Sequence, residues 1–316
     1  MELLVLRSNG EIYPANLAYQ LRSRAFIRWV DSMTYGTKMP RANPEQVMNT
    51  RIVIASPEEQ RTIVSFLDYE TAKIDALIEK KERLIELLQE KRTSLITRAV
   101  TKGLDPNVPM KDSGVEWLGK IPAHWDVRRI KHVAPIRTSK LEAKHEQVTY
   151  LGLEQIESWT GRLLLEDLPE TIESVVGSFF AGDVLLGKLR PYLAKAARPE
   201  FDGVCTSELL ALHPTEQYSS GYLFYCLINA AFIRWLNSLT YGTKMPRVSP
   251  DQVGGSSTPL PSLLEQRAIV AFLDRETAKI DALVTNIREA IDRLKEYRTA
   301  LISAAVTGKI DVRNLA

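Results

Sequence analysis

The chain has 316 residues, 45% hydrophobic and 25% charged, with a formal net charge of +2, as expected for an ordinary soluble globular protein of about two domains. No apolar run approaches the roughly 18 residues of a membrane span and no signal peptide is evident, so we expect a cytoplasmic protein whose two cysteines form no disulfide. The four histidines show no metal-ligand spacing, which argues against metal catalysis. The small positive charge neither requires nor excludes a nucleic-acid ligand.

The first 47 residues predict a strand, a helix and a loop. Residues 1–6 (MELLVL) are apolar and predict a buried strand. Residues 16–33 carry apolar side chains at helical spacing, which predicts one helix. A loop containing glycine and proline follows at residues 34–47 (TYGTKMPRANPEQV), where Lys38 and Arg41 bring two cations close together.

Residues 57–100 predict one long helix. Its apolar residues fall on a seven-residue line that runs from Leu67 to Leu95, and no glycine or proline follows Pro57. At about 1.5 Å per residue this helix is a rod of roughly 60 Å, too long for an ordinary globular helix. Such a rod needs a partner helix for its apolar seam.

The stretch from residue 106 to residue 206 occurs once. It begins with a turn-rich segment anchored by tryptophans (residues 111–125) and continues as short strands and loops. Residues 178–197 predict a strand, a turn at Gly182 and Asp183, and a second strand. Together with the residues from 207 onward, this stretch predicts a mixed α/β domain of about 150 residues.

The rest of the chain is an internal repeat. At a constant offset of 206 positions, residues 207–311 match residues 1–105, with about half of the positions identical. The second copy has its own loop, TYGTKMPRVSPDQV from Thr240, and its own rod from Glu265. Two rods of matching length and seam bury their apolar residues most simply against each other, which predicts an internal pseudo-twofold axis.

Four segments, in order along the chain, carry a resemblance to a known family: MKDSGVEWLGKIPAHW, GDVLLGKLRPY, LPSLLEQRAIVAFLD and AAVTGKID. On these segments the chain resembles, over its whole length, the specificity subunit of Type I restriction-modification enzymes. In that family two target-recognition domains each read one half of a bipartite DNA site, and each is followed by a long helix. The resemblance implies an α/β (α+β) fold of mixed sheet and helices, with the two long helices packed as an antiparallel coiled coil.

The resemblance also implies a division of the chain and a set of partners. Residues 1–56 would be the C-terminal half of a first recognition domain, 57–105 a first long helix, 106–262 a complete second recognition domain, and 263–316 a second long helix with a tail. The implied partners are double-stranded DNA, two copies of a methyltransferase subunit and, in some systems, a motor-nuclease subunit. S-adenosylmethionine, ATP and magnesium belong to those partners, so this chain is expected to hold no cofactor.

The chain departs from the family pattern at its start, because Met1 aligns with Ser207, in the middle of a recognition domain. The strand predicted at residues 1–6 would then lack its sheet partners and expose apolar surface. Three interpretations stay open. The chain is a split subunit completed by a separate N-terminal polypeptide, a half-domain completed by self-association with a second copy, or a truncated remnant.

Hydrogen-bond donors on two loops are the candidate DNA contacts. Phosphate oxygens need cations, and base edges need bidentate donors such as arginine. Pro191 and Pro246 stiffen these loops. The candidates are Lys188, Arg190, Tyr192, Lys195, Tyr241, Thr243, Lys244 and Arg247, with Lys38 and Arg41 as first-copy counterparts of Lys244 and Arg247. The competing interpretation is that these are solvated surface side chains.

Two sequences are identical in both copies and need their own explanation. The loop YGTKMPR is the same in two halves that should read different half-sites, so we expect it to contact phosphate or to serve as a scaffold before the rod. The octet ETAKIDAL is the same in both rods, as a face presented twice to two identical methyltransferase subunits would be. Its candidate partner-binding residues are Glu70, Lys73, Asp75, Glu276, Lys279 and Asp281, and the alternative is that they are solvated charges on a plain coiled coil.

Motifs for catalysis are missing from the sequence. It contains no cofactor loop of the GxG type, no Asn-Pro-Pro-aromatic motif for methyl transfer and no P-loop for ATP. We therefore expect a non-catalytic protein whose partners perform the chemistry. A stand-alone DNA-binding regulator is a further alternative, and co-purification with a methyltransferase would separate it from a specificity subunit.

Overall fold

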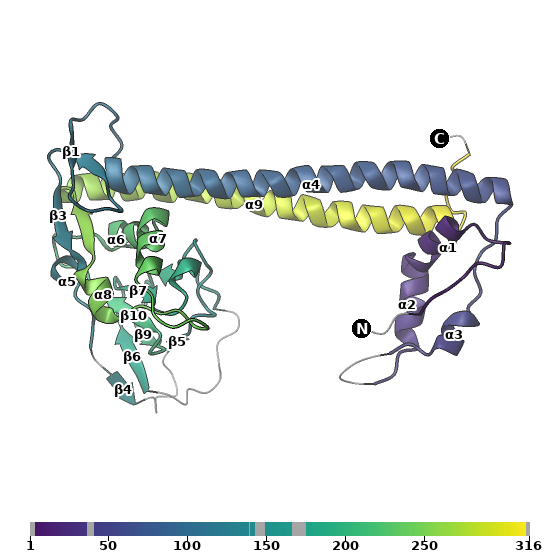
Figure 1. The fold of residues 1–316 in the computed structure, drawn as a ribbon, viewed down its shortest axis with the longest axis horizontal. Coiled ribbons are helices and arrows are strands. Elements are labelled where there is room, and N and C mark those ends of the chain that lie inside the picture. The colour runs from purple at the N-terminus through teal and green to yellow at the C-terminus, as the bar shows by residue number, and fades with distance from the viewer. Residues whose placement is uncertain (1–3, 37–40, 139, 143–148, 166–174, 314–316) are drawn as a thin grey trace. The chain divides into compact units, whose positions relative to one another are not determined.

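The computed structural model describes residues 4–36, 41–138, 140–142, 149–165 and 175–313 (Figure 1). These residues divide into two compact units. The first unit comprises residues 1–88 and 281–316, and the second unit comprises residues 89–280. The long helices α4 (Pro57–Lys102) and α9 (Leu263–Val306) each contribute one part to each unit.

The first unit packs short helices against the beginning of α4 and the end of α9. Its short helices are α1 (Pro14–Leu21), α2 (Arg24–Ser32) and α3 (Pro44–Met48). Residues 16–33 therefore form two helices, and the prediction of one continuous helix is wrong. The chain turns at Ser23, whose hydroxyl accepts a hydrogen bond from the backbone N–H of Phe26 at 3.3 Å and starts α2 as an N-cap.

The predicted strand at residues 1–6 is also wrong for the part that the structure describes. Residues 4–9 have no regular secondary structure, and Leu4 and Val5 are 47% and 78% exposed. Their counterparts in the second copy do form a strand, β10 (Leu209–Leu212), because β7 (Val184–Gly187) pairs with it in antiparallel register. A strand is stable only with a partner for its backbone groups, and among the described residues nothing pairs with residues 4–6.

The second unit contains short sheets and helices around two apolar clusters. β7 lies between β10 and β8, β3 pairs with β11, β1 pairs with β2, and a mixed sheet has the order β4-β6-β9-β5, in which only β5 and β9 run parallel among the described strands. The remaining elements of this unit are β1 (Met110–Asp112), β2 (Lys120–Pro122), β3 (Asp126–Arg129), α5 (Ile130–Val133), β4 (Lys140–Glu142), β5 (Tyr150–Leu151), β6 (Val175–Phe179), the 3-10 turn η1 (Pro191–Leu193), β8 (Ala196–Ala197), β9 (Gly203–Cys205), α6 (Ser220–Leu227), α7 (Ala230–Ser238), α8 (Pro250–Gly255) and β11 (Ser257–Leu260).

The predicted turn at Gly182 is confirmed, since this glycine has φ +91°, in the left-handed region that favours glycine. The turn separates β6 from β7 but does not make them a hairpin, because the two strands belong to different sheets.

The predicted seam of the long helices is confirmed in each unit, where α4 and α9 lie side by side (Figure 1). In the first unit Leu67 of α4 is fully buried and belongs to one cluster with Ile302 of α9. In the second unit Val100 of α4 and Leu273 of α9, both 0% exposed, share a cluster. An early part of one helix thus meets a late part of the other in both units, which is the antiparallel arrangement.

The sequence repeat is also a repeat of contacts. Tyr19 donates a hydrogen bond to Asp68 at 2.6 Å, and Tyr225, 206 positions later, donates one to Asp274 at 2.7 Å. Burial raises the pKa of both tyrosines, so that both stay protonated donors. The side chains of Gln60 and Gln266 each accept a hydrogen bond from the backbone N–H that precedes a short helix, at 2.6 and 2.7 Å. The short helices of both copies are therefore attached to the rods by the same tyrosine and glutamine hydrogen bonds.

We expect the seam to dominate the stability of the second unit. Replacing Leu273 with alanine leaves a cavity and should lower the free energy of unfolding by about 2–5 kcal/mol. The matched control is Leu264→Ala on the same helix, because Leu264 is 80% exposed and its truncation should change stability by less than about 0.5 kcal/mol. Urea unfolding followed by circular dichroism measures both, and equal effects of the two substitutions would contradict the buried seam.

Candidate nucleic-acid interface

The first predicted loop is the connection of a β-hairpin. β7 and β8 pair in antiparallel fashion, Leu185 with Ala197 and Leu186 with Ala196. The chain between them, residues 188–195, carries the four candidates predicted on this segment: Lys188, Arg190, Tyr192 and Lys195. The sequence predicted a strand on either side of the turn at Gly182 and Asp183; the hairpin that carries these four residues is instead formed by β7 and β8.

Arg190 sits in an unusual backbone conformation at the tip of this hairpin. Its φ of +50° and ψ of 63° lie in the left-handed region, which costs a residue with a side chain roughly 1–2 kcal/mol. Two contacts hold it there: its N–H donates to the carbonyl of Pro246 at 2.7 Å, and its carbonyl accepts from the N–H of Leu193 at 2.9 Å. The guanidinium is exposed and forms no ion pair with any residue that the structure describes. Strain of this kind marks candidate functional positions.

The second predicted loop, residues 241–247, is closed by its own backbone. Tyr241 and Arg247 exchange two hydrogen bonds of 3.1 Å each. Gly242 takes φ +86°, and a Cβ atom there would lie 3.3 Å from the carbonyl oxygen of Met245. The conformation of this turn explains why the loop needs its glycine, but it does not require Lys244, whose side chain is exposed.

The structure joins the two loops into one surface. Leu189 of the hairpin pairs with Arg247 of the second loop as an antiparallel bridge. On either side of this bridge, Arg190 donates to the carbonyl of Pro246 at 2.7 Å and Val248 donates to the carbonyl of Lys188 at 3.1 Å. Two segments more than fifty residues apart, each predicted on its own, therefore present their donors together.

The charge of this joined surface is positive and partly balanced. Arg247 lies 3.6 Å from a carboxylate oxygen of Glu208, with its side chain 41% exposed. Lys188, Arg190 and Lys244 form no ion pair within the described part of the chain. Tyr192 and Tyr241 are 45% and 55% exposed and offer hydroxyl donors. Guanidinium, ammonium and hydroxyl groups on a rigid backbone can bind phosphate oxygens and the edges of bases.

Lys195 has a different role from the other hairpin cations. Its ammonium donates a hydrogen bond of 2.5 Å to the carbonyl of Leu153. Burial lowers the pKa of Lys195 below its usual value, and the charge of Glu154 offsets part of that effect. The ammonium is thus a tether between the hairpin and the chain near β5, and it faces the protein.

Of the two joined loops, the first copy of the repeat has a counterpart only of the loop at residues 241–247. Tyr35 and Arg41 exchange hydrogen bonds of 3.0 and 2.9 Å, and Gly36 takes φ +93°. Arg41 is exposed, whereas Lys38 lies outside the described residues. No β-strand occurs among the residues of the first unit that the structure describes, so this loop has no hairpin beside it there.

The charged candidates on the rods are mostly paired along their own helix. Lys73 lies 2.9 Å from Glu70, and this hydrogen bond raises the pKa of Lys73. Hydrogen bonds from Lys279 and Arg275 lower the pKa of Glu276. In the first unit Asp75 accepts a hydrogen bond from Arg298 of α9 at 3.2 Å and forms an ion pair with its Nε at 3.0 Å, so it links the two helices. Asp281 is exposed on α9.

Sequence reasoning missed a buried ion cluster at the other end of β7. The carboxylate of Asp183, 1% exposed, accepts from Arg137 at 2.6 and 3.0 Å and lies 3.0 Å from Nδ1 of His213. Asp183 was read as a turn residue, and its neighbours in sequence gave no signal for partners 46 and 30 positions away. A buried carboxylate needs such partners, so this cluster fixes the base of the hairpin.

Curated relatives cover nearly the whole chain. It is 24% identical over 309 residues to the EcoDI specificity subunit of a Type I restriction enzyme from Escherichia coli, with 91% of this chain and 68% of that protein covered. It is 26% identical over 316 residues to the MjaVIII specificity subunit from Methanocaldococcus jannaschii, with coverage of 95% and 71%. The chain is homologous to Type I restriction enzyme specificity subunits. No family profile matches it.

Solved structures of proteins from Type I restriction-modification systems have the same fold. A chain in a structure that describes assembly and conformational transition of the Type I system aligns with a TM-score of 0.72 at 18% identity, covering 93% of this chain and 71% of that one. The HsdS subunit of Thermoanaerobacter tengcongensis aligns with a TM-score of 0.52 at 20% identity, with 96% and 73% covered. Among the described residues, no helix is both long and apolar enough to cross a membrane.

Proposed function

We propose that this chain is the DNA sequence-recognition subunit of a Type I restriction-modification complex in the cytoplasm. The observation that carries the proposal is the joined surface of residues 188–192 and 241–247, on a chain homologous to specificity subunits over more than nine tenths of its length. Its ligand is one half-site of a double-stranded DNA target. Cations without an ion pair among the described residues, on a backbone that two loops hold together, support this assignment.

In this proposal the two loops divide the work. Arg190 is at the hairpin tip, exposed and fixed in conformation, as a donor to base edges must be. Lys244 lies on the loop whose sequence is common to both copies, which suits a contact to the phosphate backbone. Lys195 is tethered to Leu153 and serves as support for the hairpin.

Chemistry belongs to partner subunits. We propose that a methyltransferase docks on the rods, in two copies, and supplies S-adenosylmethionine and the catalytic residues; a motor-nuclease subunit would supply ATP hydrolysis and cleavage. The repeated octet with Glu70 and Glu276 is the proposed docking face, because both glutamates are partly exposed (27% and 26%) and bind equivalent lysines at 2.9 and 3.0 Å. Asp75 contributes less to that face, since Arg298 already binds it.

The first test addresses base reading by Arg190. The chain is purified with its methyltransferase, and bound DNA is selected from a random pool at moderate salt. Replacing Arg190 with alanine should weaken binding to the selected DNA by about 1–3 kcal/mol, roughly 5- to 150-fold in Kd, because a bidentate contact is lost. Arg128→Ala, at another exposed arginine of the same unit, is the control. Unchanged affinity of the Arg190 variant would remove it from the interface.

The second test separates phosphate contact from a scaffold role for Lys244. Removing one phosphate contact should lower the slope of log K against log salt by about 1, with a similar loss of affinity for every DNA sequence. The slope is measured by titration at several salt concentrations for Lys244→Ala and for the uncharged neighbour control Thr243→Ala. A slope that stays the same in the Lys244 variant would assign the loop to the scaffold.

The third test addresses docking on the rods. Glu70→Lys combined with Glu276→Lys should abolish co-purification of the methyltransferase, because it reverses the charge of both copies of the proposed face. The fold should survive, since exposed pairs within a helix stabilise by only about 0.3–0.5 kcal/mol. Glu82→Lys, at another exposed position of α4, is the matched control. Full co-purification with the double variant would contradict docking at the octet.

A further inference from the structure

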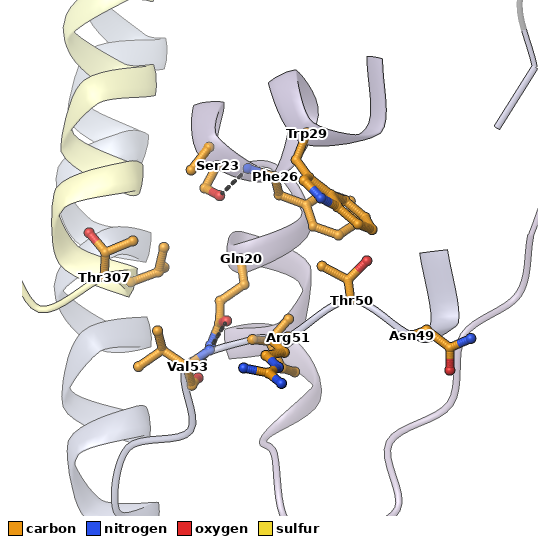
Figure 2. Close-up of a pocket in the computed structure, with 12 residues that line it drawn as sticks. Gln20, Ser23, Phe26, Trp29, Asn49, Thr50, Arg51, Val53 and Thr307 are labelled. Carbon is orange, nitrogen blue, oxygen red and sulfur yellow. Dashed lines mark hydrogen bonds between the residues drawn. The ribbon is translucent and has the colours of Figure 1, made fainter. Parts of the chain in front are cut away.

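The first unit contains an apolar groove. A pocket of about 400 Å³ lies between α1 and α2, residues 49–53 and the end of α9. Figure 2 shows Phe26 and Trp29 of α2 on one side and Thr50 and Val53 on the other, with Gln20 between them. Val53, which lines the groove, is 52% exposed, and Ile27 and Ile54, each next in sequence to a lining residue, are 47% and 53% exposed.

The internal repeat shows what covers the same surface in the second unit. Phe232 and Ile233, the counterparts of Phe26 and Ile27, are only 1% and 3% exposed. The segment from residue 110 to residue 129 covers Phe232, because Trp117 of this segment packs its ring 5.2 Å from the ring of Phe232 in an edge-on arrangement. In the first unit the same helix face has no such cover among the described residues.

A strand edge accompanies the groove. In the second unit β11 pairs with β3 of the covering segment, Thr258 with Arg128 and Leu260 with Asp126. Their counterparts in the first unit are Ile52 and Ile54, whose backbone groups form no hydrogen bond with any described residue. Val53 between them is already held, since the Gln20 amide binds its N–H at 3.2 Å and its carbonyl at 2.5 Å. Residues 52 and 54 therefore present a free, pre-arranged edge for an added strand.

A polar acceptor for the covering segment is retained as well. Glu265 at the start of α9 binds the Ser262 hydroxyl with one oxygen, at 2.9 Å, and with its other oxygen accepts from Nε1 of Trp125 at 3.1 Å. Its counterpart Glu59 binds the Ser56 hydroxyl in the same way, at 3.0 Å. The second carboxylate oxygen of Glu59 forms no hydrogen bond within the described part of the chain.

From these three features we infer that the first unit is a docking site for a polypeptide segment with the chemistry of residues 113–129. That segment would place one tryptophan on Phe26, a second tryptophan on Glu59, and an extended strand along residues 52–54. This site is separate from the DNA-binding surface and goes beyond the proposed function. Its occupant is a polypeptide segment that carries this tryptophan-anchored pattern.

A second copy of the chain is a poorer occupant. In a second copy, residues 113–129 are already packed in its own second unit, where Ile121 and Trp125 are both 0% exposed and β3 is paired with β11. Releasing the segment would expose this core and break that sheet. A free segment of the same pattern has no such cost.

The test uses the full chain and a dye-labelled synthetic peptide with the sequence of residues 106–131, followed by fluorescence anisotropy. We expect saturable binding that weakens at least tenfold with Val53→Asp in the protein, and at least tenfold when the peptide carries Trp125→Ala. The Val53 side chain is exposed, so the variant should fold normally. Tyr297→Asp, at a position of α9 that is 56% exposed, is the matched control and should bind as the unaltered chain does.

Two results would overturn the inference. One is absence of peptide binding, or equal binding to the Val53→Asp variant, which would show that the groove is not the site. The other comes from analytical ultracentrifugation of the chain alone. A dimer that forms without peptide and is lost in Val53→Asp would make a second copy the occupant.

Discussion

Burial of the apolar seam between α4 and α9 is the interaction on which the structure depends. Each unit contains one stretch of this seam, with Leu67 and Ile302 in one apolar cluster of the first unit and Val100 and Leu273 in one cluster of the second. The short helices of each unit then attach to the helix pair through a buried tyrosine and a glutamine, Tyr19 with Gln60 and Tyr225 with Gln266. Without the paired helices these hydrogen bonds would have no surface on which to hold the short helices.

The candidate interface depends on a second constraint, the closure of loops by backbone hydrogen bonds. Side chains that read DNA must be placed by something stiffer than a free loop, because positional freedom lost on binding costs affinity. Here Arg190 is held in a left-handed conformation by the carbonyl of Pro246, and the loop of Pro246 is closed by Tyr241 and Arg247. The buried carboxylate of Asp183 with Arg137 secures the other end of β7.

The two copies of the repeat show how one sequence pattern gives two surfaces. Identical contacts recur where the partners are local or lie on the rods, as in the closed loops Tyr35–Arg41 and Tyr241–Arg247. Exposure differs where a distant segment supplies the cover, as for Ile27 against Ile233. An apolar face with a free strand edge is a surface that soluble proteins normally cover, and the second copy shows which chemistry fits it.

The sequence by itself determined the long helices, the repeat, the turn at Gly182 and the loops at residues 34–47 and from Thr240. These features follow from hydrophobic periodicity, from the absence of glycine and proline, and from the conformational freedom of glycine, all of which act over a few residues. The resemblance to specificity subunits could also be recognised from the sequence, because four motifs occur in the same order as in that family.

Only the tertiary structure decided which distant segments meet. It placed β6 and β7 in different sheets and paired Leu189 with Arg247 in a β-bridge. It also directed the Lys195 ammonium to the carbonyl of Leu153 and paired Asp75 with Arg298 as an ion pair. It also left residues 4–6 without a strand, although the same pattern forms β10 beside β7. The physical reason is common to all of these cases: strand pairing and ion pairing are satisfied by partners far away in the chain, and no local pattern specifies them.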